Sequence, residues 1–202
     1  MLFNKRRTVF ISGSAYEYGR FGSSGKPFIR HLTKKLLKND FKIISGFGLG
    51  VGSVVVESAM EEVYLEKKES ITHHLRVYPF SSSQHPEGIK TSYRNDMIAQ
   101  AGIAIFVFGN KLQDISLREA DGMVEEFHIA WSNRALLIPV GASGYISEKL
   151  WKDVIERFDE YFDTREKFEL YQELGAPYTR HDRLIDLIIQ IAQQNDQEKG
   201  IH

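Results

Sequence analysis

The stretch Ser45-Gly46-Phe47-Gly48-Leu49-Gly50-Val51-Gly52-Ser53 follows an apolar run at residues 41–44 and precedes a long segment with apolar residues at helical spacing. This order predicts a strand, a glycine loop and the N-terminus of a helix. Glycines at alternate positions let the backbone take positive φ and bring N–H groups close to a ligand, and the helix adds the positive end of its dipole. The loop therefore predicts a site for an anion, most often a phosphate.

The spacing of the glycines excludes two common phosphate loops. Residue 51 is Val and residue 53 is Ser, so the pattern is not Gly-x-Gly-x-x-Gly, and no Gly-Lys-Ser/Thr follows to make a P-loop. A second interpretation stays open, in which the loop is a tight strand-to-helix turn whose glycines serve close packing.

The bulk composition suits one α/β domain over residues 1–202, because 202 residues with 42% hydrophobic side chains suffice for a core. A formal net charge of -1 provides no global basic field, so we expect neither nucleic acid nor an anionic membrane as a partner. The sequence has no cysteine, no apolar run of membrane-spanning length and no signal-peptide pattern, which favours a cytoplasmic protein.

Five apolar segments that alternate with helical patterns predict the sheet. They lie at residues 8–11, 41–44, 75–80, 104–108 and 135–140. Small or polar residues follow four of them, at Ser12 to Ser14, Ser45 to Ser53, Gly109-Asn110 and Gly141 to Gly144. The pattern predicts a Rossmann-like, doubly wound, mostly parallel sheet over about residues 8–140 with flanking helices, and a helical C-terminal segment over about residues 145–194. The ligand belongs on the edge where these loops gather.

Several residues at this edge are candidates for ligand binding. Lys111 can bind a phosphate as a point charge, and Phe80, just past a strand end, can stack on a base or be an ordinary core aromatic. Glu126 lies in the first turn of a helix that opens at Asp121-Gly122, where it either serves the site or compensates the helix dipole. The candidates are Ser12, Gly13, Ser14, Gly46, Phe47, Gly48, Gly50, Phe80, Arg94, Gly109, Asn110, Lys111 and Glu126.

The sequence lacks the usual motifs of a metal site or of a cysteine nucleophile. The seven histidines are scattered apart from His73-His74, and no cysteine nucleophile or His-Glu-x-x-His motif is present, so we expect no metal site. In the helix after the glycine loop, Ser53 is the expected N-cap, and Tyr64 is expected to face inward.

Three segments together resemble a known superfamily: Ile11-Ser12-Gly13-Ser14, the glycine loop, and Arg94 followed by Gly109 and Gly122-Met123-Val124-Glu125-Glu126. Over about residues 8–140 the chain resembles the SLOG superfamily, which joins Smf/DprA-type proteins with the "lonely guy" phosphoribohydrolases. The resemblance implies a nucleotide pocket. In the phosphoribohydrolases, residues at the positions of Arg94 and Glu126 form the catalytic pair.

The chain departs from the phosphoribohydrolases in ways that favour another branch of the superfamily. Leu112 to Asp121 form an insertion, Met123 stands where those enzymes have Thr, and Asn95 stands where they usually have Lys. The opening at residues 11–19 and the Gly-Asn-Lys loop are similar to the sensor branch. That branch lies at the C-terminus of Thoeris antiphage effectors, behind a sirtuin-like NAD-cleaving domain, and senses a cyclic ADP-ribose isomer.

This resemblance implies a non-catalytic sensor that needs no cofactor, self-associates as a dimer or tetramer and switches an attached NADase. Arg94 and Lys111 would pair with the ligand's pyrophosphate, and Glu126 would accept hydrogen bonds from ribose hydroxyls. Two alternatives stay open. One is a nucleoside-monophosphate N-glycosidase with Glu126 as acid/base and Arg94 orienting it; the other is a plain scaffold with incidental glycine turns.

Overall fold

The computed structural model describes residues 3–66, 70–78, 87–177 and 179–198. The strands of its main sheet are β1 (Thr8–Ser14), β2 (Lys42–Ser45), β3 (Leu75–Val77), β4 (Ile103–Phe108) and β7 (Leu136–Pro139). The helices are α1 (Gly25–Lys38), α2 (Gly52–Leu65), α3 (Glu87–Ile98), α4 (Gly122–Ser132), α5 (Tyr145–Glu156), α6 (Phe158–Tyr161), α7 (Phe168–Leu174) and α8 (His181–Glu198).

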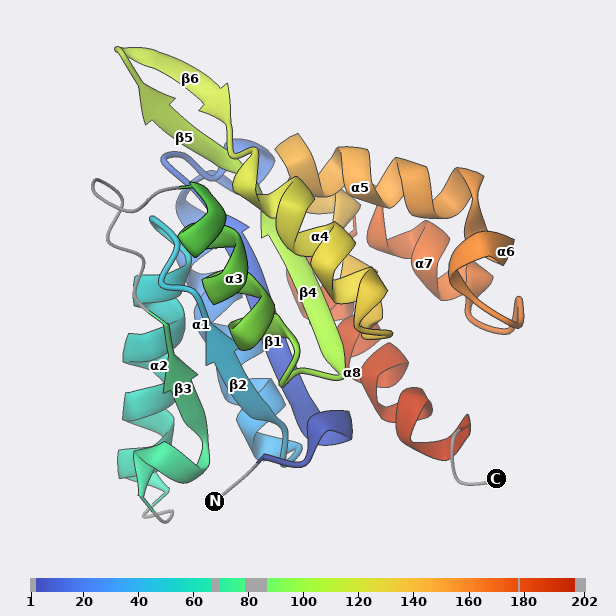
Figure 1. Cartoon of the computed structure of the whole chain (residues 1–202), viewed down its shortest axis with the longest axis horizontal. Helices are drawn as coiled ribbons and strands as arrows, with labels where there is room; N and C mark the ends of the chain where they lie inside the picture. The colour runs from blue at the N-terminus through green and yellow to red at the C-terminus, as the bar shows by residue number, and fades with distance from the viewer. Residues whose placement is uncertain (1–2, 67–69, 79–86, 178, 199–202) are drawn as a thin grey trace.

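The five strands form one parallel sheet in the order β3-β2-β1-β4-β7 (Figure 1). The chain first runs outward from β1 to β3, then returns to the other side of β1 through β4. This reversal places a topological switch point between β1 and β4, where open α/β sheets bind ligands at the carboxyl ends of their strands. The predicted Rossmann-like fold is confirmed.

The core lies on both faces of the sheet. Every residue of β4 is buried, as expected for a central parallel strand. Helices α3 and α4 cover one face and α1, α2 and α8 the other, while α5, α6 and α7 pack on the β7 side (Figure 1). The helical C-terminal segment therefore completes the cover of the sheet. None of the helices in the described part of the chain is long and apolar enough to cross a membrane.

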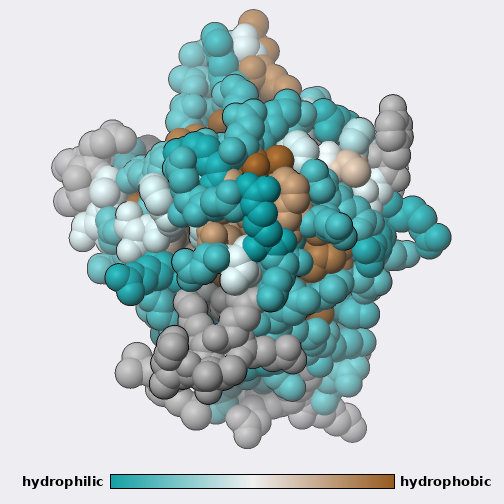
Figure 2. Space-filling model, turned by 90° about the vertical axis from the view of Figure 1, so that its right-hand side faces the viewer, coloured by the Kyte–Doolittle hydropathy of each residue, from teal (hydrophilic) through white to brown (hydrophobic). Residues whose placement is uncertain are grey.

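The predicted insertion at residues 112–121 is not a plain loop. Strands β5 (Asn110–Gln113) and β6 (Ser116–Glu119) form an antiparallel hairpin, and Asp114 and Ile115 make its turn with φ of 48° and 63°. Two consecutive residues with positive φ match the twist of a two-residue hairpin. The hairpin projects from the body with apolar residues near its tip (Figure 2).

The structure corrects two local predictions, and a third falls on a residue outside the described ranges. Ser53 is not the N-cap, because α2 begins one residue earlier and the cap position, Val51, makes no side-chain hydrogen bond. Tyr64 does not face inward, since 83% of it is exposed at the end of α2. The third strand ends at Val77, and Phe80 lies outside the described residues.

Candidate functional site

A pocket opens at the switch point, where the carboxyl end of β1 and the segments that follow β2 and β4 meet helices α3 and α4. Its volume is about 560 Å³, which lies in the range of small-molecule sites. The residues that line it are Phe10, Ile11, Ser12, Gly13, Ser14, Gly46, Phe47, Gly48, Leu49, Gly50, Ser53, Lys90, Arg94, Ala120, Gly122, Met123 and Glu126.

The glycine loop closes against the end of β1. Ala15 N donates to Leu49 O at 2.7 Å, and Tyr18 Oη donates to Gly50 O at 2.7 Å. A Cβ on Gly48 would lie 2.1 Å from Gly13 O, so only glycine lets the two backbones approach this closely. Close packing is therefore one role of these glycines. It does not exclude the other role, because the same close approach places the loop backbone in the pocket wall.

Two apolar side chains of the loop stand at the pocket wall and reach solvent. Phe47 has a φ of 59°, which is uncommon for a bulky residue, and 48% of it is exposed. Leu49 is 59% exposed. An aromatic ring held in this way offers a surface on which a base or sugar can pack.

The floor of the pocket carries a buried carboxyl group. Ser12 Oγ, from β1, donates to Glu126 Oε2, from α4, at 2.6 Å, and only 14% of the Glu126 side chain is exposed. Burial raises the pKa of the Glu126 carboxyl above its usual range, against the opposite effects of the Ser12 hydrogen bond and of Arg94. A carboxyl group with a raised pKa can either accept hydrogen bonds from ligand hydroxyls or serve as an acid/base.

Arg94 of α3 faces this carboxyl group and also a second one. Its Nε lies 3.6 Å from Glu126 Oε1, and its Nη1 donates to Glu125 Oε2. Helix α3 also contributes Lys90 to the wall. Lys90 and Arg94 are four residues apart and so share one face of α3, which places two cationic residues in the pocket wall.

The Gly109-Asn110-Lys111 segment, predicted as a loop, enters strand β5 and is not among the residues that line the pocket. Asn110 is fully buried; its Oδ1 accepts from Tyr16 N at 3.0 Å and Glu17 N at 3.1 Å, and its Nδ2 donates to Glu17 O at 2.9 Å. Lys111 Nζ lies 3.4 Å from Asp121 Oδ2. Asn110 thus holds the segment that follows β1, and direct ligand contact by these three residues stays a prediction.

Nine of the predicted site residues do line one pocket: Ser12, Gly13, Ser14, Gly46, Phe47, Gly48, Gly50, Arg94 and Glu126. Lys90 and Ala120 are among the lining residues that the sequence did not predict. The signal for Lys90 was its spacing of one helical turn from Arg94, whereas Ala120 joins the wall only because the hairpin returns the chain there, through the bond from Ala120 N to Gly109 O. Within the described ranges, no three His, Cys, Asp or Glu side chains gather as metal ligands would.

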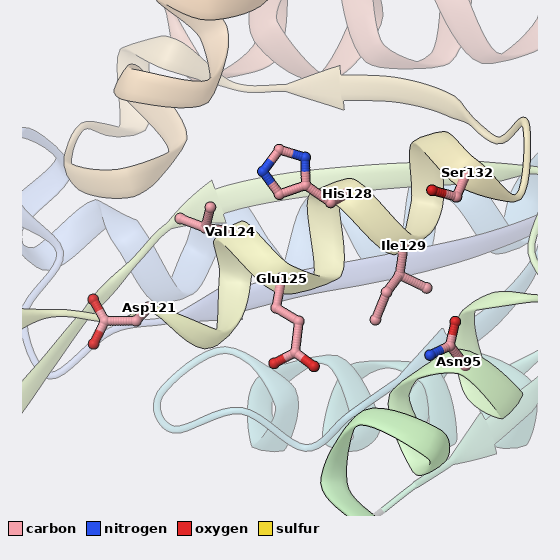
Figure 3. Close-up of a pocket in the computed structure, with 7 residues that line it drawn as sticks. All are labelled: Asn95, Asp121, Val124, Glu125, His128, Ile129 and Ser132. Atoms are coloured by element: carbon pink, nitrogen blue, oxygen red, sulfur yellow. The ribbon is translucent and has the colours of Figure 1, made fainter. Parts of the chain in front are cut away.

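A second, open hollow of about 660 Å³ lies on the outer side of α4. We call it the outer groove; it is lined by Asn95, Asp121, Val124, Glu125, His128, Ile129 and Ser132. Figure 3 shows Asn95 on α3 across from Ile129, with Glu125 extended from α4 toward α3 and His128 directed to the other side of α4. Glu125 therefore lies between the outer groove and the Arg94 side of the pocket.

A Rossmann-like sheet with a glycine loop, two cations and a carboxyl group at its switch point defines the class of nucleotide-binding α/β domains. The chain belongs, more narrowly, to the Sir2- and TIR-associating SLOG family, whose model matches residues 3–195.

Relatives support this assignment. The chain is 38% identical to NAD(+) hydrolase ThsA of Bacillus cereus (strain MSX-D12), over 94% of this chain and 40% of the relative. It is 38% identical to NAD(+) hydrolase ThsA of Acinetobacter baumannii (strain 532279), over 90% of this chain and 41% of the relative. The chain thus spans about two fifths of the length of these proteins.

A solved structure, DNA processing protein A from Helicobacter pylori, is similar at a TM-score of 0.49 with 13% identity, over 94% of this chain and 85% of that chain.

Proposed function

We propose that the pocket binds a cyclic ADP-ribose isomer and that the domain is a sensor rather than an enzyme. The observation that carries the proposal is the convergence of Arg94, Lys90 and Glu126 with the glycine loop at the switch point. Cations and loop N–H groups suit a pyrophosphate, and a buried carboxyl acceptor suits ribose hydroxyls. The volume of about 560 Å³ suits a compact dinucleotide-sized ligand.

The relatives' name, NAD(+) hydrolase, supports a role for the sensor. Since they are NAD(+) hydrolases of which this chain matches only about two fifths, we propose that the domain acts with a separate NAD-cleaving domain in antiphage defence. Binding would shift a self-associated module between two arrangements and switch that domain on. This requires only that the ligand bind one arrangement more tightly, by a few kcal/mol.

The test is isothermal titration of the chain with cyclic ADP-ribose isomers, ADP-ribose, NAD and AMP, followed by chromatography of each mixture. A cyclic isomer that binds tightly and is recovered intact supports the sensor. Arg94→Ala should abolish binding without unfolding the chain. Arg30→Ala is the matched control, because Arg30 pairs with Glu57 and Glu61 on α2, away from the pocket. Unchanged affinity in Arg94→Ala would overturn the pocket assignment.

A second candidate is the N-glycosidase of a nucleoside monophosphate. The observation that favours it is the raised pKa of Glu126 beside Arg94, which suits an acid/base. Free adenine released from AMP, and lost in Glu126→Gln, would support this enzyme and count against the sensor.

A further inference from the structure

The guanidinium of Arg94 is shared between two carboxyl groups of α4. Its Nη1 pairs with Glu125, while its Nε lies 3.6 Å from Glu126. The Arg94 side chain is only 15% exposed, and that of Glu125 is 32% exposed. Because the pair is partly shielded from water, its attraction is stronger than that of a surface ion pair.

Glu125 approaches Arg94 from the side opposite to the pocket. It lines the outer groove and is absent from the pocket lining, and Figure 3 shows its side chain directed toward α3. Its second oxygen, Oε1, accepts a hydrogen bond of 2.7 Å from Thr91 Oγ1, one turn before Arg94 on α3. Glu125 thus bridges two residues of α3 and is held in place by both.

Gly122 makes room for this arrangement. A Cβ at this position, the first residue of α4, would lie 2.7 Å from Arg94 Nη2. The guanidinium therefore lies against the first turn of α4, with Glu125 on the groove side and Glu126 on the pocket side.

We propose that Glu125 is a positioning residue that competes with the anionic ligand for Arg94 and thereby sets the affinity of the pocket for phosphate groups. Arginine recognises phosphate through paired N–H donors in a rigid fork. A phosphate in the pocket must draw donors and positive charge that Glu125 already engages. This inference rests on the proposed function only in that the same pocket takes an anion.

The experiment is isothermal titration of the chain and of Glu125→Gln with two probes, inorganic pyrophosphate as the anion and adenosine as a neutral nucleoside. We expect Glu125→Gln to bind pyrophosphate about five-fold more tightly, because it removes one competing partly exposed charge. The gain should shrink at high salt. Binding of adenosine should not change, which separates competition for Arg94 from a general change in the shape of the pocket.

Two further variants make the test decisive. Glu61→Gln removes the same charge from a residue that pairs with Arg30 and Lys34 on the other face of the sheet, and it should leave both affinities unchanged. Thr91→Val removes only the hydroxyl that supports Glu125, and it should strengthen pyrophosphate binding by a smaller factor. If Glu125→Gln does not fold, Thr91→Val decides alone.

Pyrophosphate binding to Glu125→Gln that is no tighter than to the wild type, or an equal gain for adenosine, overturns the proposal. If Glu125→Gln binds pyrophosphate more tightly than the wild type does, but neither protein binds a cyclic ADP-ribose isomer, the proposed function is overturned and the role of Glu125 is supported.

Discussion

Ser12 and Glu126 lie 114 residues apart in the sequence and are joined by a hydrogen bond of 2.6 Å that ties the end of β1 to the first turns of α4. The contact crosses the switch point of the sheet. It keeps a carboxyl group at the pocket floor, where burial raises its pKa. A charged group in such a place costs stability, and this cost has a measurable dependence on pH.

We expect Glu126→Gln to raise the free energy of unfolding at pH 7 by about 1 kcal/mol, because it removes the cost of burying a carboxylate. A carboxyl pKa that is raised in the folded state makes wild-type stability fall as the pH rises from about 4.5 through the folded value. The gain should therefore vanish near pH 4. Urea denaturation at several pH values measures it.

The control for this prediction is Glu57→Gln, which removes an exposed carboxylate of α2 and should not reproduce the pattern. Equal stability of the wild type and Glu126→Gln at every pH would contradict the assigned burial cost. Glu126→Gln should also weaken ligand binding. The two measurements together would show that the wild-type carboxyl group lowers stability and supports binding.

Gly48→Ala should destabilise the chain by about 1 to 3 kcal/mol, since the added Cβ meets a backbone oxygen that cannot move aside as a flexible side chain can. That oxygen, Gly13 O, would lie 2.1 Å away. The control is Ser53→Ala in the same loop-to-helix segment, where no cap bond is lost and a change below about 0.5 kcal/mol is expected. Thermal denaturation compares them, and similar losses in both would refute the packing argument.

Asn110→Ala should cost about 2 to 4 kcal/mol, because it removes three partly buried hydrogen bonds to the backbone of Tyr16 and Glu17. Hydrogen exchange at the Tyr16 and Glu17 amides should accelerate. Lys111→Ala, one residue on, should leave stability unchanged and lower ligand affinity less than Arg94→Ala does, because Lys111 does not line the pocket. Protection of both amides in Asn110→Ala would contradict this role.

The sheet could be predicted from the sequence because each strand is a short apolar run and four of the five carboxyl ends carry glycine or serine. Parallel pairing then places those ends on one edge, so Ser12, the glycine loop and Glu126 were predicted together and do line one pocket. Such reasoning follows from chain connectivity and strand direction alone.

Side-chain partners that depend on packing could not be predicted. The hairpin has Asp114 and Ile115 at its turn rather than Asn-Gly, so no turn signal marked it. Asn110 was expected at the ligand, yet its amide is engaged by the backbone after β1, a contact set by how that loop folds back. Glu125 and Glu126 are neighbours in sequence, and only the position of α3 shows that they approach Arg94 from opposite sides.

His181 gives a last prediction, on acid stability. Its ring stacks on that of Phe21, with the two ring centroids 4.1 Å apart. Burial lowers the pKa of His181 below 6.5, although the negative charge of Asp182 acts to raise it. The folded state keeps the imidazole neutral while the unfolded chain takes up a proton, so stability falls as the pH drops from 6.5 through the folded value. His181→Phe keeps the stack and should flatten this loss between about pH 7 and pH 5 in urea denaturation. An NMR titration that places the His181 pKa at or above 6.5, or identical slopes for both proteins, would show that the neutral ring contributes nothing to this pH dependence.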